Sequence, residues 1–290
     1  MFCSLFGYTK QAYYKCSTRS YQGSIKAQQA REAVLEIRKQ MPRIGTRKLI
    51  FMLKAEFENN QIKMGRDRLF DLLRADGLLV IKRKRYTVTT DSNHWLHKHP
   101  NLIKELDINK PEQVWVADIT YIDTASEPGY LHLITDAYSK QIMGYELCND
   151  MHATSTLKAL KMAIKGRMYE DREIIHHSDR GSQYCSKLYT NWLVKNKFKI
   201  SMTENGDPYE NAIAERANGI LKDEFGLGEQ IKDVQEAKIQ ASQSIGIYNN
   251  VRPHLSCNYL TPKEMHRQDI VPRKRWKKKI PKSRKSAVVV

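Results

Sequence analysis

Three acidic residues stand where the neighbouring sequence predicts regular structure. Asp118 lies inside the apolar segment VWVADITYI, Asp179 ends the short apolar run EIIHHSD, and Glu215 lies in a segment of helical character. Taken singly, each has an ordinary explanation as a residue of an edge strand, a turn or a solvated helix face. Taken together, two strand-borne aspartates and one helical glutamate can converge at one edge of a sheet. Carboxylates gathered there repel and raise one another's pKa unless cations neutralise them.

Such a cluster favours metal-assisted phosphoryl transfer. Two divalent ions about 3.5–4 Å apart can activate an attacking oxygen and stabilise the leaving oxygen of an in-line displacement. Magnesium suits this chemistry because it keeps water and substrate phosphate among its ligands, and manganese can replace it because it also prefers oxygen ligands. We therefore expect two magnesium ions, with Asp118, Asp179 and Glu215 as both catalytic residues and metal ligands.

The elements that must position these acids form an α/β core. From Val114 the hydrophobic period is two, so Val114, Val116 and Asp118 share one face of a strand. The elements predicted after it are two strands over 130–147, a helix over about 154–166, a strand ending at Asp179, a helix over 187–195 and a strand near 198–202. This order indicates a mixed sheet with flanking helices.

The last core helix has a clear start signal. The segment DPYE (207–210) offers a capping box with proline at the first helical position. From there Asn211, Glu215, Asn218 and Lys222 recur at helical spacing and form one stripe. The third acid should therefore lie on a helix face shared with two amides and a cation.

The charge distribution points to a polyanionic partner. The chain has 290 residues and a formal net charge of +17. Residues 1–90 carry +12 and residues 263–290 carry +9, whereas residues 91–262 carry −4. Two basic ends thus flank an acidic middle, which favours a nucleic-acid enzyme over a protein that only coats DNA.

The basic N-terminal part predicts a helix-turn-helix over about 42–90. Two short helices surround a polar turn, and the second places Leu69 and Leu73 on one face and Arg66 and Arg68 outside it. Such a pair suits DNA-groove binding, although a solvated helix pair has the same pattern. The basic residues that follow and fit phosphate contact are Lys82, Arg83, Lys84 and Arg85.

Three segments together resemble a known family. They are WVADITY (115–121), HSDRGSQY (177–184) and NGDPYENAIAERANGILK (205–222), with 35 residues between Asp179 and Glu215. This set resembles the integrase core of insertion-sequence transposases of the OrfB type, which are relatives of retroviral integrases. The segment YNNVRPH (248–254) resembles another motif of that family. The match covers roughly residues 40–265.

The resemblance implies a ribonuclease-H-like fold with a mixed five-stranded sheet and flanking helices, preceded by a small helical helix-turn-helix domain. It implies DNA nicking at the element ends, which frees a 3′-hydroxyl, followed by strand transfer into target DNA. It also implies a homo-oligomer on DNA and a possible fusion partner encoded by an upstream frame. The closest rivals are a metal-dependent DNA nuclease without strand transfer and a DNA-binding regulator with an inactive core.

Further DNA contacts follow from the same resemblance. Lys222 stands where the family carries a basic residue that contacts the element end, and Asn211 is expected on the same DNA-facing stripe. Tyr209 can stack on a base or pack on the core. Arg252 can touch DNA or fix the last helix, and the sequence slightly favours the structural role. Asp136 is a further acid near the site, more consistent with a strand-end turn.

The domain plan has four parts. We expect a helical DNA-binding region over 1–90, a linker over 91–112, the catalytic core over 113–265 and a basic tail over 266–290. No apolar window is long enough to span a membrane, and five scattered cysteines without a C-x-x-C pair argue against a disulfide framework. A bacterial cytoplasmic, nucleoid-associated protein is the natural expectation.

Overall fold

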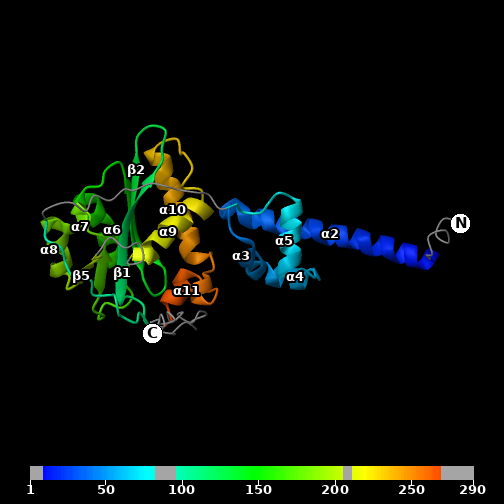
Figure 1. The fold of residues 1–290 in the computed structure, drawn as a ribbon, viewed down its shortest axis with the longest axis horizontal. Coiled ribbons are helices and arrows are strands. Elements are labelled where there is room, and N and C mark those ends of the chain that lie inside the picture. The colour runs from blue at the N-terminus through cyan, green and yellow to red at the C-terminus, as the bar shows by residue number, and fades with distance from the viewer. Residues whose placement is uncertain (1–8, 82–95, 205–210, 269–290) are drawn as a thin grey trace, which may run out of the picture.

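The computed structural model describes residues 9–81, 96–204 and 211–268, and Figure 1 shows a helical N-terminal part beside an α/β core. The first helix of the described residues, α2 (Lys10–Gln40), projects away from the remainder of the structure at its N-terminal end. It stops just before Pro42, where proline cannot continue a helix. The predicted linker over 91–112 contains no helix or strand in its described part, 96–112.

Three short helices complete the N-terminal part. They are α3 (Thr46–Met52), α4 (Lys54–Asn59) and α5 (Arg66–Ala75). On α5 the side chains of Leu69 and Leu73 are fully buried, while Arg66 and Arg68 are exposed, as the sequence predicts. Gly77 follows α5 with a φ of 66°, a left-handed conformation that favours glycine and ends the helix.

The core contains a five-stranded sheet in the order β3-β2-β1-β4-β5, which confirms the predicted mixed sheet. Strand β1 pairs antiparallel with β2, and β2 with β3, whereas β4 and β5 run parallel to β1. The strands are β1 (Val114–Ile122), β2 (Gly129–Asp136), β3 (Ile142–Cys148), β4 (Ile175–Ser178) and β5 (Lys199–Met202). This is the ribonuclease-H-like arrangement that the sequence resemblance implies.

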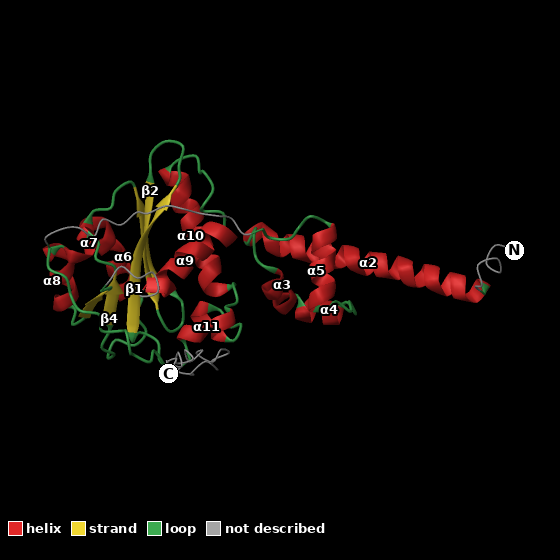
Figure 2. Cartoon of the chain, in the orientation of Figure 1, coloured by secondary structure: helices red, strands yellow, loops and turns green. Residues whose placement is uncertain are grey.

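Helices cover both faces of the sheet (Figure 2). One face packs against α6 (Ala153–Lys165), α7 (Ser182–Cys185) and α8 (Lys187–Lys195). The other packs against α9 (Ala212–Glu224) and α10 (Val234–Asn250), followed by a 3-10 turn, η2 (Leu255–Cys257), and α11 (Pro262–His266). The alternation in β1 sets this division. Trp115 and Ala117 join the first cluster, while Val114 and Val116 share a separate hydrophobic cluster with Ala214 of α9.

Helix α9 follows the segment 207–210, whose predicted capping box lies outside the described residues. Its first residue is Ala212 and Asn211 is the N-cap, while residues 205–210 lie outside the described chain. The helical N-terminal part and the core share one hydrophobic cluster, which includes Leu49 of α3, Ile220 of α9 and Tyr248 of α10. The N-terminal helices therefore pack directly on the side of the core that carries α9.

Candidate functional site

The two aspartates meet through the register of neighbouring parallel strands. Strand β1 pairs with β4 so that Val116 lies beside His177. Asp118 and Asp179 each follow two residues later, so they lie on the same face of the sheet at adjacent positions. That face is the one covered by α9.

Asp118 is held on both oxygens and carries a perturbed pKa. Its Oδ1 accepts a hydrogen bond from the N–H of Ile119 at 2.9 Å, and its Oδ2 accepts one from Asn218 at 2.7 Å. The pKa of Asp118 is raised to about 7, mainly by burial, with further contributions from the charge of Asp179 and, to a smaller degree, Glu215. The site therefore concentrates negative charge around one carboxyl group.

Asp179 lies at the start of the turn after β4. Its Oδ1 accepts a hydrogen bond from the N–H of Gly181 at 3.0 Å, a short-range contact typical of an Asx turn. Tyr184 of α7 is buried on the other face of the sheet. Burial raises the pKa of its hydroxyl well above the ordinary value, and the charges of Asp179 and Asp118 raise it further. The turn thus fixes the position of Asp179.

Glu215 approaches from α9. Its side chain is exposed in the first turn of the helix, and partial desolvation raises its pKa. Within residues 9–81, 96–204 and 211–268, no three His, Cys, Asp or Glu side chains are arranged to hold a metal ion. The structure therefore brings the two aspartates together and places Glu215 close enough for its charge to act on Asp118, without a complete ligand cage.

The α9 stripe contributes two buried amides. Asn211 is 6% exposed, and its Nδ2 donates to the carbonyl of Ala117 at 3.3 Å. Asn218 is also buried and holds Asp118. Sequence spacing placed Asn218 on the same stripe as Glu215 but assigned it no role, because the strand register that brings it to Asp118 is not visible in the helix pattern. Lys222, half-buried, lies one turn further on.

Other predicted DNA contacts lie on α5 or outside the described residues. Arg66 and Arg68 are exposed on α5, where Arg66 pairs with Asp67 at 2.8 Å. Tyr209 and the basic run Lys82, Arg83, Lys84 and Arg85 lie outside the described residues, as does the basic segment 273–285. DNA contact by these residues stays a prediction.

Arg252 has a different environment from a DNA-contacting residue. Its side chain is 1% exposed and makes a two-pronged ion pair with Glu224, at 2.7 and 2.8 Å. Lys48 of α3 binds the same carboxylate at 2.8 Å. These contacts match a structural role for Arg252, which the sequence slightly favours over DNA contact.

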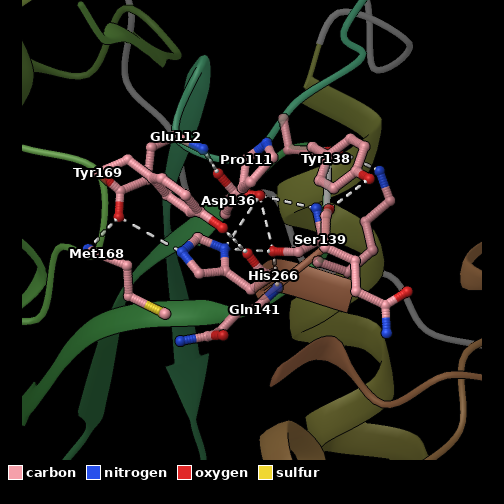
Figure 3. Close-up of polar contacts among 12 residues, drawn as sticks. Pro111, Glu112, Asp136, Tyr138, Ser139, Gln141, Met168, Tyr169 and His266 are labelled. Atoms are coloured by element: carbon pink, nitrogen blue, oxygen red, sulfur yellow. Dashed lines mark hydrogen bonds and ion pairs between the residues drawn. The ribbon is translucent and has the colours of Figure 1, made fainter. Parts of the chain in front are cut away.

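Asp136 belongs to a separate buried cluster at the end of β2 (Figure 3). Its Oδ1 accepts from the N–H and hydroxyl of Ser139, both at 2.7 Å, and its Oδ2 accepts from the N–H of Glu112 at 2.7 Å. His266 of α11 lies between the two acids, 3.4 Å from Glu112 Oε1 and 3.7 Å from Asp136 Oδ1. Asp136 therefore ends the strand and ties it to α11.

Among the described helices none is long and apolar enough to cross a membrane. The described cysteines, Cys148, Cys185 and Cys257, are buried thiols without disulfides.

Comparisons with known proteins agree on one family. The integrase core domain matches residues 108–208, and a second integrase core domain family matches residues 196–262. The chain is 34% identical over 268 residues to the 31 kDa protein of insertion element IS600 from Shigella sonnei, covering 90% of this chain and 95% of that protein. It is 30% identical over 200 residues to transposase InsF of insertion sequence IS3A from Escherichia coli, covering 68% of this chain and 69% of that protein.

Solved structures similar to this chain include the catalytic core domain of HTLV-2 integrase in complex with magnesium. The identity is 16%, the TM-score is 0.44, and the match covers 54% of this chain and 97% of that one.

Proposed function

The chain belongs to the insertion-sequence transposases with an integrase core, and on that premise we propose that it nicks DNA at the ends of its element and joins the freed end to target DNA. The family implies polynucleotidyl transfer. The observation that carries the finer proposal is the alignment of Asp118 in β1 with Asp179, directly after the parallel strand β4, beneath the helix that bears Glu215.

The donor set fits divalent cations. Three carboxylates are the hard oxygen ligands that magnesium prefers, and the raised pKa of Asp118 reflects negative charge that a cation would offset. We propose that Asp118, Asp179 and Glu215 hold two magnesium ions, with manganese as a substitute, and closure of this cage requires the Glu215 carboxylate to approach the two aspartates. Bound ions of this kind stabilise charge on the attacking and leaving oxygens of a phosphodiester.

The proposed reaction has two phosphoryl-transfer steps. In the first, water attacks the phosphorus at the element end, the P–O3′ bond breaks, and the strand is left with a 3′-hydroxyl and a 5′-phosphate. In the second, that 3′-hydroxyl attacks a target phosphodiester, whose own O3′ leaves. Asn218 keeps the Asp118 carboxylate in place through both steps, and Lys222 lies on the same stripe to meet DNA phosphate.

Positive charge outside the core supplies affinity for DNA in this proposal. We propose four parts: a helix-turn-helix region, a linker, a catalytic core and a basic tail. In the first part, Arg66 and Arg68 on α5 contact DNA phosphates. Because phosphate contacts release counterions, affinity for DNA falls steeply with added salt. Assembly as a homo-oligomer on DNA, and fusion to a product of an upstream frame, belong to the same proposal.

The decisive experiment is Glu215→Gln with magnesium and DNA that carries the element end. The variant should lose nicking almost completely and bind DNA as the wild type does, while Glu170→Gln, at an exposed glutamate outside the α9 stripe, should keep full nicking. Nicking by Glu215→Gln at the wild-type rate would refute the assignment of the three acids. Joined products identify a transposase, whereas products that are only shortened would indicate a nuclease.

A further inference from the structure

A cavity of about 400 Å³ lies where the N-terminal helices meet the core. Residues of α3, α9, α10 and the segment 252–259 line it. On α9 the lining residues are Ala212, Ile213, Arg216, Ala217 and Ile220. At 100° per residue the centre of this arc lies about 160° around the helix from the centre of Glu215 and Asn218. The cavity and the acidic site therefore lie mainly on different sides of α9.

The cavity wall is strongly basic. Its cationic and imidazole side chains are Arg47, Lys48, Lys140, Arg216, Arg252 and His254. Among the described residues that line it there is no aspartate or glutamate. Glu224 offsets part of this charge from behind by pairing with Lys48 and Arg252. Arg47 and Arg216 line the cavity from exposed positions, and neither forms an ion pair with a residue in the described part of the chain.

A buried imidazole offers an unused polar atom on the same wall. His254 is 7% exposed, and its Nε2 has no hydrogen-bond partner among the described residues. The pKa of His254 is lowered to about 2, mainly by burial and to a smaller degree by the nearby charges of Arg252, Lys48, Lys140 and Arg216. The cations around this neutral ring repel one another, and a bound anion would reduce that repulsion. The wall is therefore suited to an anionic ligand.

The other part of the wall is apolar and aromatic. Ile213, Ile220 and Leu255 line it beside the ring of Tyr248, which meets His254 edge to face with 5.3 Å between ring centroids. Tyr259 at the same wall is stacked on Phe51 of α3, with 4.5 Å between centroids. The volume falls within the range of about 300–1,000 Å³ typical of small-ligand sites. A ligand that carries both a flat apolar body and an anionic group fits this combination, and a nucleotide has both.

We propose that this cavity binds one nucleotide of a DNA strand, with the phosphate between Arg47 and Arg216 and the base against the apolar wall. The inference rests on the proposed function only in taking DNA as the ligand. It assigns a role to the 248–254 motif, whose Tyr248, Arg252 and His254 build one side of the cavity. The N-terminal helices and the core then bind the same DNA strand, because α3 and α9 each supply one arginine that binds its phosphate.

The test measures binding of a fluorescein-labelled single strand of twelve thymidines by fluorescence anisotropy. The full chain is used in EDTA, so that catalytic failure cannot affect the outcome. We expect the double variant Arg47→Ala/Arg216→Ala to weaken binding at least tenfold. The slope of log K against log salt concentration should become shallower by roughly 0.7, the value for one phosphate contact on a single strand. Ser256→Trp, which fills the cavity from an exposed lining position, should weaken binding by a similar factor. Lys187→Ala on α8, an exposed cation outside the cavity, should stay within twofold of the wild type.

Thermal unfolding checks that each variant is folded, and Ala212→Trp replaces Ser256→Trp if the latter is not. Wild-type binding by either filled-cavity variant would overturn the proposal, even if the arginine variant binds weakly, because the arginines would then bind DNA outside the cavity. Free thymidine monophosphate and inorganic phosphate serve as competitors. If monophosphate stabilises the wild type but not the filled variant, and strand binding is unchanged by filling, the cavity takes free nucleotides and its assignment to a DNA strand is wrong.

Discussion

The side-chain amide of Asn218 donates a 2.7 Å hydrogen bond to Oδ2 of Asp118, which joins α9 to the centre of β1. Asn218 lies one turn after Glu215 on the same helix. The bond lowers the pKa of Asp118, against the larger effect of burial and the charge of Asp179, which raise it. The position and ionisation of the strand acid are thus coupled to the helix that carries the third acid.

Asn218→Ala should reduce the rate of magnesium-dependent nicking about tenfold and change DNA affinity less than twofold. A buried carboxylate that loses a hydrogen bond to its ionised form is both less well oriented and harder to ionise. Single-turnover nicking of end-labelled DNA measures the rate. Asn250→Ala, which removes an exposed helix asparagine on α10, is the matched control and should nick at the wild-type rate. An unimpaired Asn218→Ala would show that orientation of Asp118 does not depend on this bond.

Local patterns in the sequence predict most of the frame around the site. The period of two in 114–122 separates Val116 and Asp118 from Trp115, and the structure packs these faces against different helices. The apolar run before Asp179 predicts β4. These signals are short in range, because alternation and helical spacing depend on neighbours within one element.

Contacts between distant segments could not be predicted in this way. Lys48 meets Glu224 across 176 positions, and His266 meets Glu112 across 154. Both pairs depend on how whole elements pack, which periodicity does not encode.

Glu224→Gln should destabilise the fold by about 3–5 kcal/mol, because it leaves the buried cations of Arg252 and Lys48 without their shared carboxylate. Urea unfolding followed by circular dichroism gives the free energy. Glu36→Gln removes one partner of the exposed pair with Lys39 and should change stability by less than about 0.5 kcal/mol. Equal effects of the two substitutions would contradict a stabilising role for the buried pair.

Gly144→Ala should cost at least about 2 kcal/mol of stability. A methyl group at Gly144 in β3 would collide with the carbonyl of Ala159 and come within 2.7 Å of the backbone nitrogen of Ala163, so that α6 must move away from the sheet. Gly246→Ala, in the middle of α10 with open space around it, should instead stabilise by roughly 0.5–1 kcal/mol. Gly144→Ala should therefore lower the melting temperature and Gly246→Ala should raise it. If both variants shift it in the same direction, the close contact between β3 and α6 is wrong.

The buried cluster around His266 predicts a loss of stability in mild alkali. Burial alone would lower the pKa of His266, but its contacts with Asp136 and Glu112 outweigh burial and raise the pKa from 6.5 to about 9. A group whose pKa is higher in the folded state stabilises the fold fully below about pH 6.5, and this contribution disappears as the pH rises through 9. The shift corresponds to about 3 kcal/mol. Melting temperatures measured from pH 6.5 to 9.5 should fall, and they should fall much less in His266→Gln, which has no proton to lose. His152→Gln, at an exposed histidine, should keep the wild-type pH response. If His266→Gln shows the same slope as the wild type, the imidazole does not carry its charge between the two acids.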